Sequence, residues 1–188
     1  MKALGISGSP RKDGNSMLIT NHVLKAISDE GIDTELISLA GLNIRPCVAC
    51  MSCLKAERCV LDDDLMPIYE KMKAADGIIL TTPVYFGSAT ALIKGLMERT
   101  GYVIRNNGSS FKGRVGLPLV VGRRGGLTFT MAQMTCWFQT LEFYLSGVAH
   151  WPIAVGNDRG AVADDKEGMD AAWNVGKSLA FLMQAIHK

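Results

Sequence analysis

The chain begins with a short apolar run that leads into a polar, glycine-containing stretch, Ser7-Gly8-Ser9-Pro10-Arg11-Lys12-Asp13-Gly14-Asn15-Ser16. Residues 3–6 are few enough to form a buried strand, and the apolar residues of segment 17–27 recur at helical spacing. The stretch therefore joins a strand end to a helix start, where backbone N–H groups lack partners and the helix dipole favours an anion. Hydroxyl, amide and guanidinium donors lie within it, at Ser9, Arg11, Asn15 and Ser16. We interpret the stretch as a phosphate-binding loop.

Three better-known loops do not fit this stretch. A Walker-type P-loop ends in Gly-Lys-Ser/Thr, whereas residues 14–16 read Gly-Asn-Ser. A dinucleotide fingerprint needs a carboxylate at the end of the second strand, and residues 37–40 contain none. A hydrolase nucleophile elbow needs a glycine at the position of Ser9. A polar turn without a ligand is the remaining alternative, and the number of donors beside Arg11 favours phosphate over it.

Strand-like and helical segments alternate along the whole chain. The expected strands are residues 2–7, 34–39, 77–82, 115–122 and 148–155, and the expected helices are residues 16–28, 64–75, 89–99, 128–145 and 165–187. This alternation predicts an α/β fold with three layers, in which a doubly wound, five-stranded parallel sheet has the flavodoxin-like order 2-1-3-4-5. In that order a ligand binds beside strands one and three, outside their carboxyl ends.

Length and composition indicate a single globular domain over residues 1–188. Hydrophobic residues make up 48% of the 188 residues, and the net charge of +2 suggests neither nucleic acid nor a membrane surface as a partner. No secretion signal and no run long enough for a membrane helix is visible, so we expect a cytoplasmic protein. Two insertions interrupt the alternation: a cysteine-rich one at about 41–63, and residues 102–113, which we expect to form a mobile surface loop.

The loops after the third and fourth expected strands contain further candidate ligand contacts. Tyr85 and Phe86 lie at the expected carboxyl edge, where a tricyclic aromatic ligand would find stacking contacts and exposed backbone hydrogen-bonding groups. Alone, the two rings are better explained by packing at the sheet edge; together with the phosphate-binding loop they favour a ligand. Arg123 and Arg124, between glycines, would neutralise negative charge on a cofactor, with a solvated loop as the alternative.

These three loops together resemble the NAD(P)H-dependent FMN reductases of the flavodoxin-like superfamily, over nearly the whole chain. The resemblance implies that the first loop binds the FMN phosphate, that residues 82–87 line the isoalloxazine ring, and that residues 123–126 close over its far side. The residues expected to contact the cofactor are Ser9, Arg11, Asn15, Ser16, Met17, Thr82, Pro83, Val84, Tyr85, Phe86, Gly87, Arg123 and Gly125. We nominate no catalytic side chain, because the flavin itself carries the chemistry.

Four of the five cysteines lie within thirteen positions, at Cys47, Cys50, Cys53 and Cys59. Such density without a secretion signal is more typical of a metal site than of disulfides. Four thiolates satisfy a [4Fe-4S] cluster, one per iron; tetrahedral zinc and reactive thiols without metal are the alternatives. The spacing Cys-x2-Cys-x2-Cys-x5-Cys, followed by Asp62-Asp63, is most similar to that of the iron-sulfur flavoproteins. That resemblance implies a [4Fe-4S] cluster close to the FMN.

Two further expectations concern single side chains near these motifs. Asp63 or Asp64 is expected to cap the helix that follows the cysteines, since carboxylates favour a helix N-terminus. Cys136 lies among apolar residues of an expected helix and is expected to be a small buried hydrophobe.

The resemblance implies an oxidoreductase that passes electrons from NADPH, NADH or a ferredoxin-like donor through FMN to a small acceptor. Such proteins are usually homodimers or homotetramers. The alternatives are an electron carrier without a nicotinamide site, in which another protein reduces the cluster, and a non-enzymatic module in which flavin or thiols sense redox state.

Overall fold

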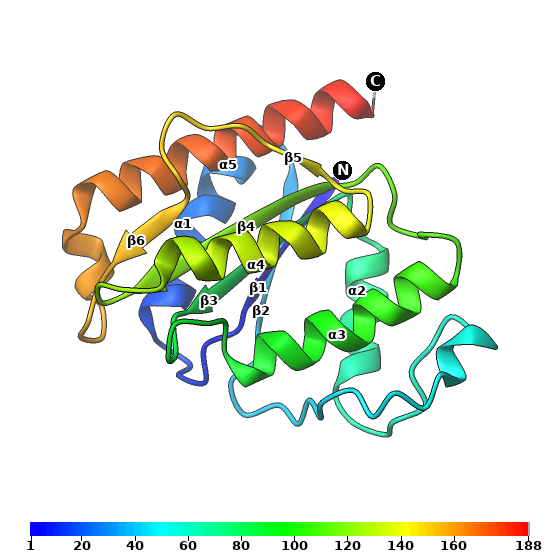
Figure 1. Cartoon of the computed structure of the whole chain (residues 1–188). Coiled ribbons are helices and arrows are strands. Elements are labelled where there is room, and N and C mark those ends of the chain that lie inside the picture. Colours follow the sequence, from blue (N-terminus) through cyan, green and yellow to red (C-terminus); the bar gives the residue numbers. More distant parts are fainter. Residues whose placement is uncertain (188) are drawn as a thin grey trace.

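A parallel β-sheet forms the middle layer of the protein, as the computed structural model, which describes residues 1–187, shows (Figure 1). Its strands are β1 (Lys2–Ser7), β2 (Asp33–Ser38), β3 (Gly77–Pro83), β4 (Val115–Gly122), β5 (Tyr144–Leu145) and β6 (Ile153–Val155). The order β2-β1-β3-β4-β5 and the parallel pairing of every neighbour confirm the predicted doubly wound sheet. The central strands β3 and β4 are buried almost throughout, as is usual for parallel strands covered on both faces.

Helices cover both faces of this sheet. They are α1 (Asn15–Ser28), α2 (Leu65–Lys73), α3 (Ala91–Asn106), α4 (Leu127–Thr140) and α5 (Lys166–Ile186). Helices α1 and α5 form one core with the sheet, and α2, α3 and α4 form the other. Side chains of β3 alternate between the two cores: Ile79 joins the first, and Ile78 and Leu80 join the second.

The edge of the sheet beyond β4 differs from the expected strand 148–155. Two short strands pair with β4 instead, with Val115 opposite Tyr144 in β5 and Val121 opposite Ala154 in β6. The expected helix 128–145 ends at Thr140, so the prediction is wrong for residues 141–145. The helix cannot continue because Glu142 adopts a φ of 61°, and Phe143 turns inward to pack 5.1 Å from the ring of Phe138.

The segment 102–113, expected to be a surface loop, is mostly packed structure. Helix α3 continues to Asn106, seven residues beyond the expected end of the helix at Arg99. Phe111 is fully buried, with its ring stacked 5.4 Å from that of Tyr69 and the Arg114 guanidinium 4.2 Å from its centroid. The expectation of a loop over the whole segment is wrong, because Val103, Ile104 and Phe111 anchor it to the core.

The loops that follow β1, β3, β4 and β6 leave the same edge of the sheet, since parallel strands share the direction of their carboxyl ends. The cysteine-rich insertion, drawn in cyan, runs beside α2 and α3 and contains one short 3₁₀ turn, η1 (Ser52–Leu54) (Figure 1). A second 3₁₀ turn, η2 (Ala161–Asp164), precedes α5. Within residues 1–187, no helix is both long enough and apolar enough to span a bilayer.

Candidate functional site

The loop after β1 is fixed against its neighbours before α1 begins. The backbone N–H of Gly8 donates to the carbonyl of Thr81 at 2.7 Å, and the Gly8 carbonyl accepts from Thr90 Oγ1 at 2.6 Å. A Cβ atom at Gly8 would lie 2.7 Å from Cβ of Ile93, so only glycine permits this close approach to α3.

Helix α1 begins without a side-chain cap. Its N-cap residue is Gly14, and its first turn contains no acidic residue. Ser16 is buried, and its Oγ has no hydrogen-bond partner among the described residues. Ser9 is also buried, with Oγ accepting from the backbone N–H of Arg11 at 3.1 Å. Free helix N–H groups beside an unpaired hydroxyl and an arginine are suited to an anion.

The loop after β3 forms a tight turn with an aromatic residue at its tip. Tyr85 and Ser88 exchange both backbone hydrogen bonds, at 2.9 and 3.1 Å. Between them Phe86 and Gly87 have φ values of 50° and 78°, as in a type I′ turn. This conformation is unfavourable for a phenylalanine, whose ring is nonetheless fully exposed. The turn therefore presents an aromatic surface to solvent beside the phosphate-binding loop.

Four loops enclose a cleft of about 180 Å³ at the carboxyl edge of the sheet. The residues that line it are Ser9, Arg11, Gly14, Asn15, Ser16, Pro83, Val84, Tyr85, Val121, Gly122, Arg123, Gly156, Asn157 and Arg159. Three arginines and no carboxylate side chain are among them, so the cleft attracts anions. The fold thus brings together eight of the thirteen residues expected to contact the cofactor: Ser9, Arg11, Asn15, Ser16, Pro83, Val84, Tyr85 and Arg123.

The other five expected residues, Met17, Thr82, Phe86, Gly87 and Gly125, lie outside the lining of this cleft. Met17 is half-buried in the first turn of α1, Phe86 and Gly87 form the tip of the turn, and Gly125 is exposed. Thr82 is fully buried, and its Oγ1 accepts from the backbone N–H of Thr90 at 3.1 Å. Thr82 therefore anchors the start of α3 rather than facing the cleft.

Gly126 allows the loop after β4 to approach the turn after β3. It has a φ of 80°, and a Cβ atom there would lie 2.7 Å from Cα of Gly87. On the opposite side of the same contact, the Thr130 hydroxyl lies 3.4 Å from the Gly87 carbonyl, to which it donates. A side chain at Gly126 would separate two walls of the cleft.

Sequence reasoning missed the contribution of the loop after β6. Gly156, Asn157 and Arg159 line the cleft, and Asn15 connects this loop to α1. The Asn15 side chain donates to the carbonyl of Asp158 at 2.9 Å and lies 3.5 Å from the backbone N–H of Val162, from which it accepts. A usable signal was present, because a glycine-containing loop with an arginine follows the last expected strand directly.

The four clustered cysteines line a single pocket beside α3. Among residues 1–187, no three His, Cys, Asp or Glu side chains lie close enough together to hold a single metal ion. A cubane cluster differs in this respect, because each thiolate binds a separate iron. The arrangement of the thiols around one pocket is compatible with such a cluster.

The backbone around Cys50 is unusual. Ala49 and Met51 on either side of it have φ values of 51° and 57°, which non-glycine residues adopt only where their surroundings require it. Alternation of left- and right-handed residues turns N–H groups toward one point, and such concave backbones bind anions and iron-sulfur clusters. Hydrogen bonds from the side chain and the backbone of Ser52 lower the pKa of the Cys50 thiol.

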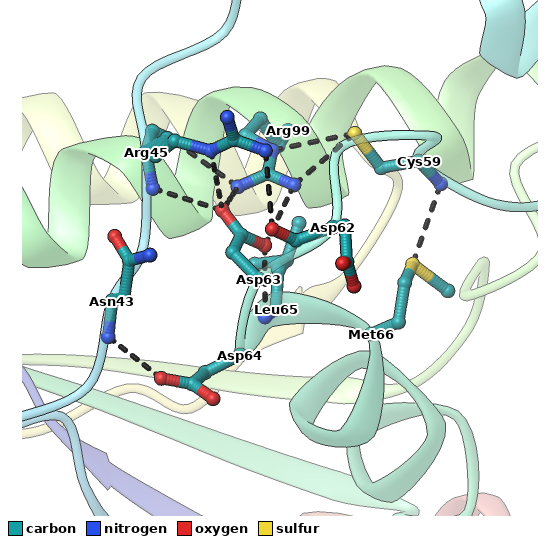
Figure 2. Close-up of polar contacts among 9 residues, drawn as sticks. All are labelled: Asn43, Arg45, Cys59, Asp62, Asp63, Asp64, Leu65, Met66 and Arg99. Atoms are coloured by element: carbon teal, nitrogen blue, oxygen red, sulfur yellow. Dashed lines mark hydrogen bonds and ion pairs between the residues drawn. The ribbon is translucent and has the colours of Figure 1, made fainter.

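Helix α3 supplies donors to two of the cysteine sulfurs. Nε and Nη2 of Arg99 each lie 3.3 Å from Sγ of Cys59 (Figure 2). About two helical turns further along, Nδ2 of Asn106 donates to Sγ of Cys53 at 3.2 Å. Hydrogen bonds to ligand sulfurs are among the determinants of iron-sulfur cluster potentials.

Arg99 also forms a buried ion pair with Asp63. The two nitrogen–oxygen distances are 2.5 and 3.0 Å, and both side chains are almost fully shielded from solvent. Burial by itself raises the pKa of Asp63, but hydrogen bonds from Arg99 and from the backbone of Arg45 and Leu65 outweigh it and hold that pKa below its ordinary value. Burial by itself lowers the pKa of Arg99, but its hydrogen bonds to Asp63 and Cys59 outweigh burial and hold that pKa above its ordinary value.

The acidic residues after Cys59 act only in part as the sequence suggests. Asp64 is the N-cap residue of α2, yet its side chain makes no capping bond and accepts instead from the backbone N–H of Asn43 at 2.7 Å. Asp63 does accept from the backbone N–H of Leu65 at 3.2 Å, but its main partner is Arg99. These carboxylates join the two ends of the cysteine segment (Figure 2). Cys136, expected to be buried, is exposed on the outer side of α4.

Arg99 itself was not identified from the sequence, although a signal existed. It lies three residues after Leu96 and four before Val103, both of which face the core, so helical spacing places a charged residue on the apolar side of α3. An arginine at such a position needs a buried partner, and the acidic residues at 62–64 are the obvious candidates.

We expect Asp63→Asn to lower the free energy of unfolding at pH 7 by about 3 kcal/mol, because it leaves the buried Arg99 charge unpaired. Since the pKa of Asp63 is lowered in the folded state, its contribution is complete above pH about 4 and is lost as the pH falls through the native pKa. The difference in stability between wild type and variant should therefore shrink below pH about 4, as measured by urea unfolding across a pH series. The control is Asp62→Asn. Asp62 is exposed, and its contact with Arg45 uses the backbone carbonyl, which the substitution keeps. Equal losses of stability for both variants would contradict the importance of the ion pair.

The sequence and the fold both match known proteins. The family model described as NADPH-dependent FMN reductase matches residues 1–158. An iron-sulfur flavoprotein of Methanocaldococcus jannaschii is 40% identical over 200 residues, covering 100% of both chains. An iron-sulfur flavoprotein of Methanosarcina thermophila is 34% identical over 197 residues, covering 100% of this chain and 98% of its own.

Among solved structures, RosB with the bound intermediate 8-demethyl-8-formylriboflavin-5'-phosphate has a TM-score of 0.77 at 13% identity, with coverage of 100% of this chain and 80% of that one. A flavodoxin from the domain Archaea has a TM-score of 0.65 at 12% identity, with coverage of 98% and 99%. These structural likenesses show the flavodoxin-like fold. The match of the family model and the identity to the two iron-sulfur flavoproteins show the family. The chain belongs to the NADPH-dependent FMN reductase family, within which it joins the iron-sulfur flavoproteins.

Proposed function

We propose that this protein is an FMN-binding oxidoreductase of the iron-sulfur flavoprotein type, which passes electrons from NADPH or NADH to a small acceptor. One observation carries the proposal: a cleft at the carboxyl edge of the sheet that contains Arg11, Arg123 and Arg159 and no carboxylate side chain. In an open α/β sheet this edge is the usual place for a ligand.

The residues present fit FMN. The uncapped start of α1, the unpaired Ser16 hydroxyl and Arg11 suit the phosphate, while Pro83, Val84 and Tyr85 offer an apolar and aromatic wall for a ring system. The exposed ring of Phe86 would extend that wall at the mouth of the cleft. Bound FMN would supply the hydride and single-electron chemistry that protein side chains lack. Arg123 would then lie where it compensates negative charge on the ring.

The cysteine segment fits a [4Fe-4S] cluster held by Cys47, Cys50, Cys53 and Cys59. Its support is the common pocket, the left-handed residues Ala49 and Met51 on either side of Cys50, and the donors directed at two of the sulfurs. Such a cluster would supply one-electron transfer. The names of the similar archaeal proteins support the same interpretation.

Arg11→Ala should weaken FMN binding by roughly 10- to 100-fold, because a hydrogen bond to a charged group contributes about 1.5–3 kcal/mol. Fluorescence titration of the apoprotein with FMN measures this change. Riboflavin, which lacks the phosphate, should bind wild type and variant equally well. The matched control is Lys12→Ala, since Lys12 is an exposed neighbouring cation that does not line the cleft. An equal loss for both ligands, or for both variants, would argue against a phosphate site at Arg11.

Protein made without air should contain about four irons and four sulfides per chain, as a [4Fe-4S] cluster requires. Cys47→Ser should lose this iron and the corresponding visible absorption while keeping FMN. Cys136→Ser should keep both, because Cys136 lies on α4 outside the pocket. Wild-type protein that is iron-free, or that contains one zinc per chain instead, would contradict the cluster.

A second candidate function is an electron carrier without a nicotinamide site. The observation that favours it is the exposure of the cysteine segment, where Cys50, Val48 and Met51 all reach solvent and a protein donor could approach. In that case a ferredoxin-like protein would deliver electrons to the cluster.

Rapid mixing of FMN-loaded protein with NADPH, with NADH or with reduced ferredoxin distinguishes the two functions. The proposed enzyme should show bleaching of the flavin absorbance with at least one nicotinamide, and Cys47→Ser should retain that reaction. Reduction by ferredoxin alone, abolished in Cys47→Ser, would replace the proposal with the carrier.

A further inference from the structure

The guanidinium of Arg99 has every N–H donor committed, and two of them point at one cysteine sulfur. Nε and Nη2 face Sγ of Cys59, each at 3.3 Å. Nη1 and Nη2 face the carboxylate of Asp63 at 2.5 and 3.0 Å, and Nη1 also donates to the carbonyl of Arg45 at 3.1 Å. The side chain is 1% exposed, so water does not compete for these contacts.

These contacts join the two ends of the cysteine segment. Arg45 lies two residues before Cys47, while Cys59 is the last of the four cysteines and Asp63 follows four residues later. Arg45 contributes to the same junction, because its backbone N–H donates to Asp63 at 3.0 Å and its guanidinium donates to the carbonyl of Asp62 at 3.1 Å. Figure 2 shows Arg99 between Arg45 of the first segment and Cys59 of the second. One side chain on a rigid helix thus sets the position of the Cys59 sulfur.

Cys59 is singled out from the other three cysteines by the charge of its donor. Cys53 accepts from the neutral amide of Asn106, and Cys47 lies 3.5 Å from the backbone N–H of Ala49. The donor to Cys50 is Ser52, which is also neutral. Among the described residues, only Cys59 receives hydrogen bonds from a cation.

The hydrogen-bond donors at this position suit an anionic sulfur. Asp63 neutralises the charge of Arg99 and occupies one side of its guanidinium fork. The remaining two donors face sulfur, which accepts strongly only as thiolate, the form that binds iron. A positive group that donates to a ligand sulfur favours the reduced, more negative state of a cluster.

We propose that Arg99 is a positioning residue that holds Cys59 as a cluster ligand and, through its two hydrogen bonds to that sulfur, raises the reduction potential of the cluster. The inference rests on the proposed [4Fe-4S] cluster. Asp63 opposes the effect of Arg99 on the potential, because its negative charge lies against the same guanidinium, and it also fixes the orientation of the fork. The two partners of the ion pair therefore shift the potential in opposite directions, although both stabilise the fold.

The test is a redox titration of anaerobically made protein, followed by electron paramagnetic resonance, with iron content measured on each sample. Arg99→Gln should lower the cluster potential, and Asp63→Asn should raise it. Arg99→Lys keeps the charge but not the fork, so a stable protein is expected with a potential between those of wild type and Arg99→Gln. The control is Arg105→Gln, which removes an exposed arginine from the same helix and should leave the potential unchanged. The FMN potential should be unchanged in every variant, because Arg99 does not line the FMN cleft.

A purely structural role for Arg99 would lower stability and iron content in the Arg99 and Asp63 variants without shifting the potential of the cluster that remains. That result, or equal shifts in Arg99→Gln and Arg105→Gln, would overturn the inference and leave the proposed function intact. If Arg99→Gln does not fold, a wild-type potential in Arg99→Lys would overturn it in the same way. Wild-type protein that assembles no cluster would overturn both this inference and the cluster in the proposed function.

Discussion

All strands of the sheet run in the same direction, and the remainder of the molecule follows from that constraint. Parallel pairing sends each connection across a face of the sheet and returns each functional loop to one edge. The loops after β1, β3, β4 and β6 are far apart in sequence, yet they meet there and form one cleft. The hydrogen-bond donors of these loops are thereby concentrated at one edge of the sheet.

Helix α3 connects the two candidate sites. Its start lies beside the cleft, where Thr90 caps the helix by accepting from the backbone N–H of Ile93 and also donates to Gly8 in the phosphate-binding loop. Its middle and end hold the cysteine segment, through Arg99 and Asn106. A rigid element that supports both candidate sites fixes their relative position more reliably than loops could. The buried ion pair of Arg99 and Asp63 is part of this support.

The sequence was sufficient for the fold class, because apolar periodicity and strand order depend on local pattern and on general rules of topology. It was also sufficient for those site residues that lie in glycine-bounded loops after clear strands, such as Ser16 and Arg123. The sequence was not sufficient where tertiary contacts determine the position of a residue. Phe143 leaves the helical pattern because a core aromatic cluster accepts it, and Thr82 turns away from the cleft to bond Thr90. Arg99 was missed because its partners are distant in sequence, and Arg159 because the other walls of the cleft are.

The amide of Asn15 joins the first loop of the chain to the last one, and α1 packs against α5 in the same core. One wall of the cleft is supplied by residues 156–159, which a ribosome adds only after the loops that form its other three walls. The cleft therefore cannot exist on a nascent chain that still lacks its C-terminal part. A ligand can enter the complete cleft only after residues 156–159 have been made.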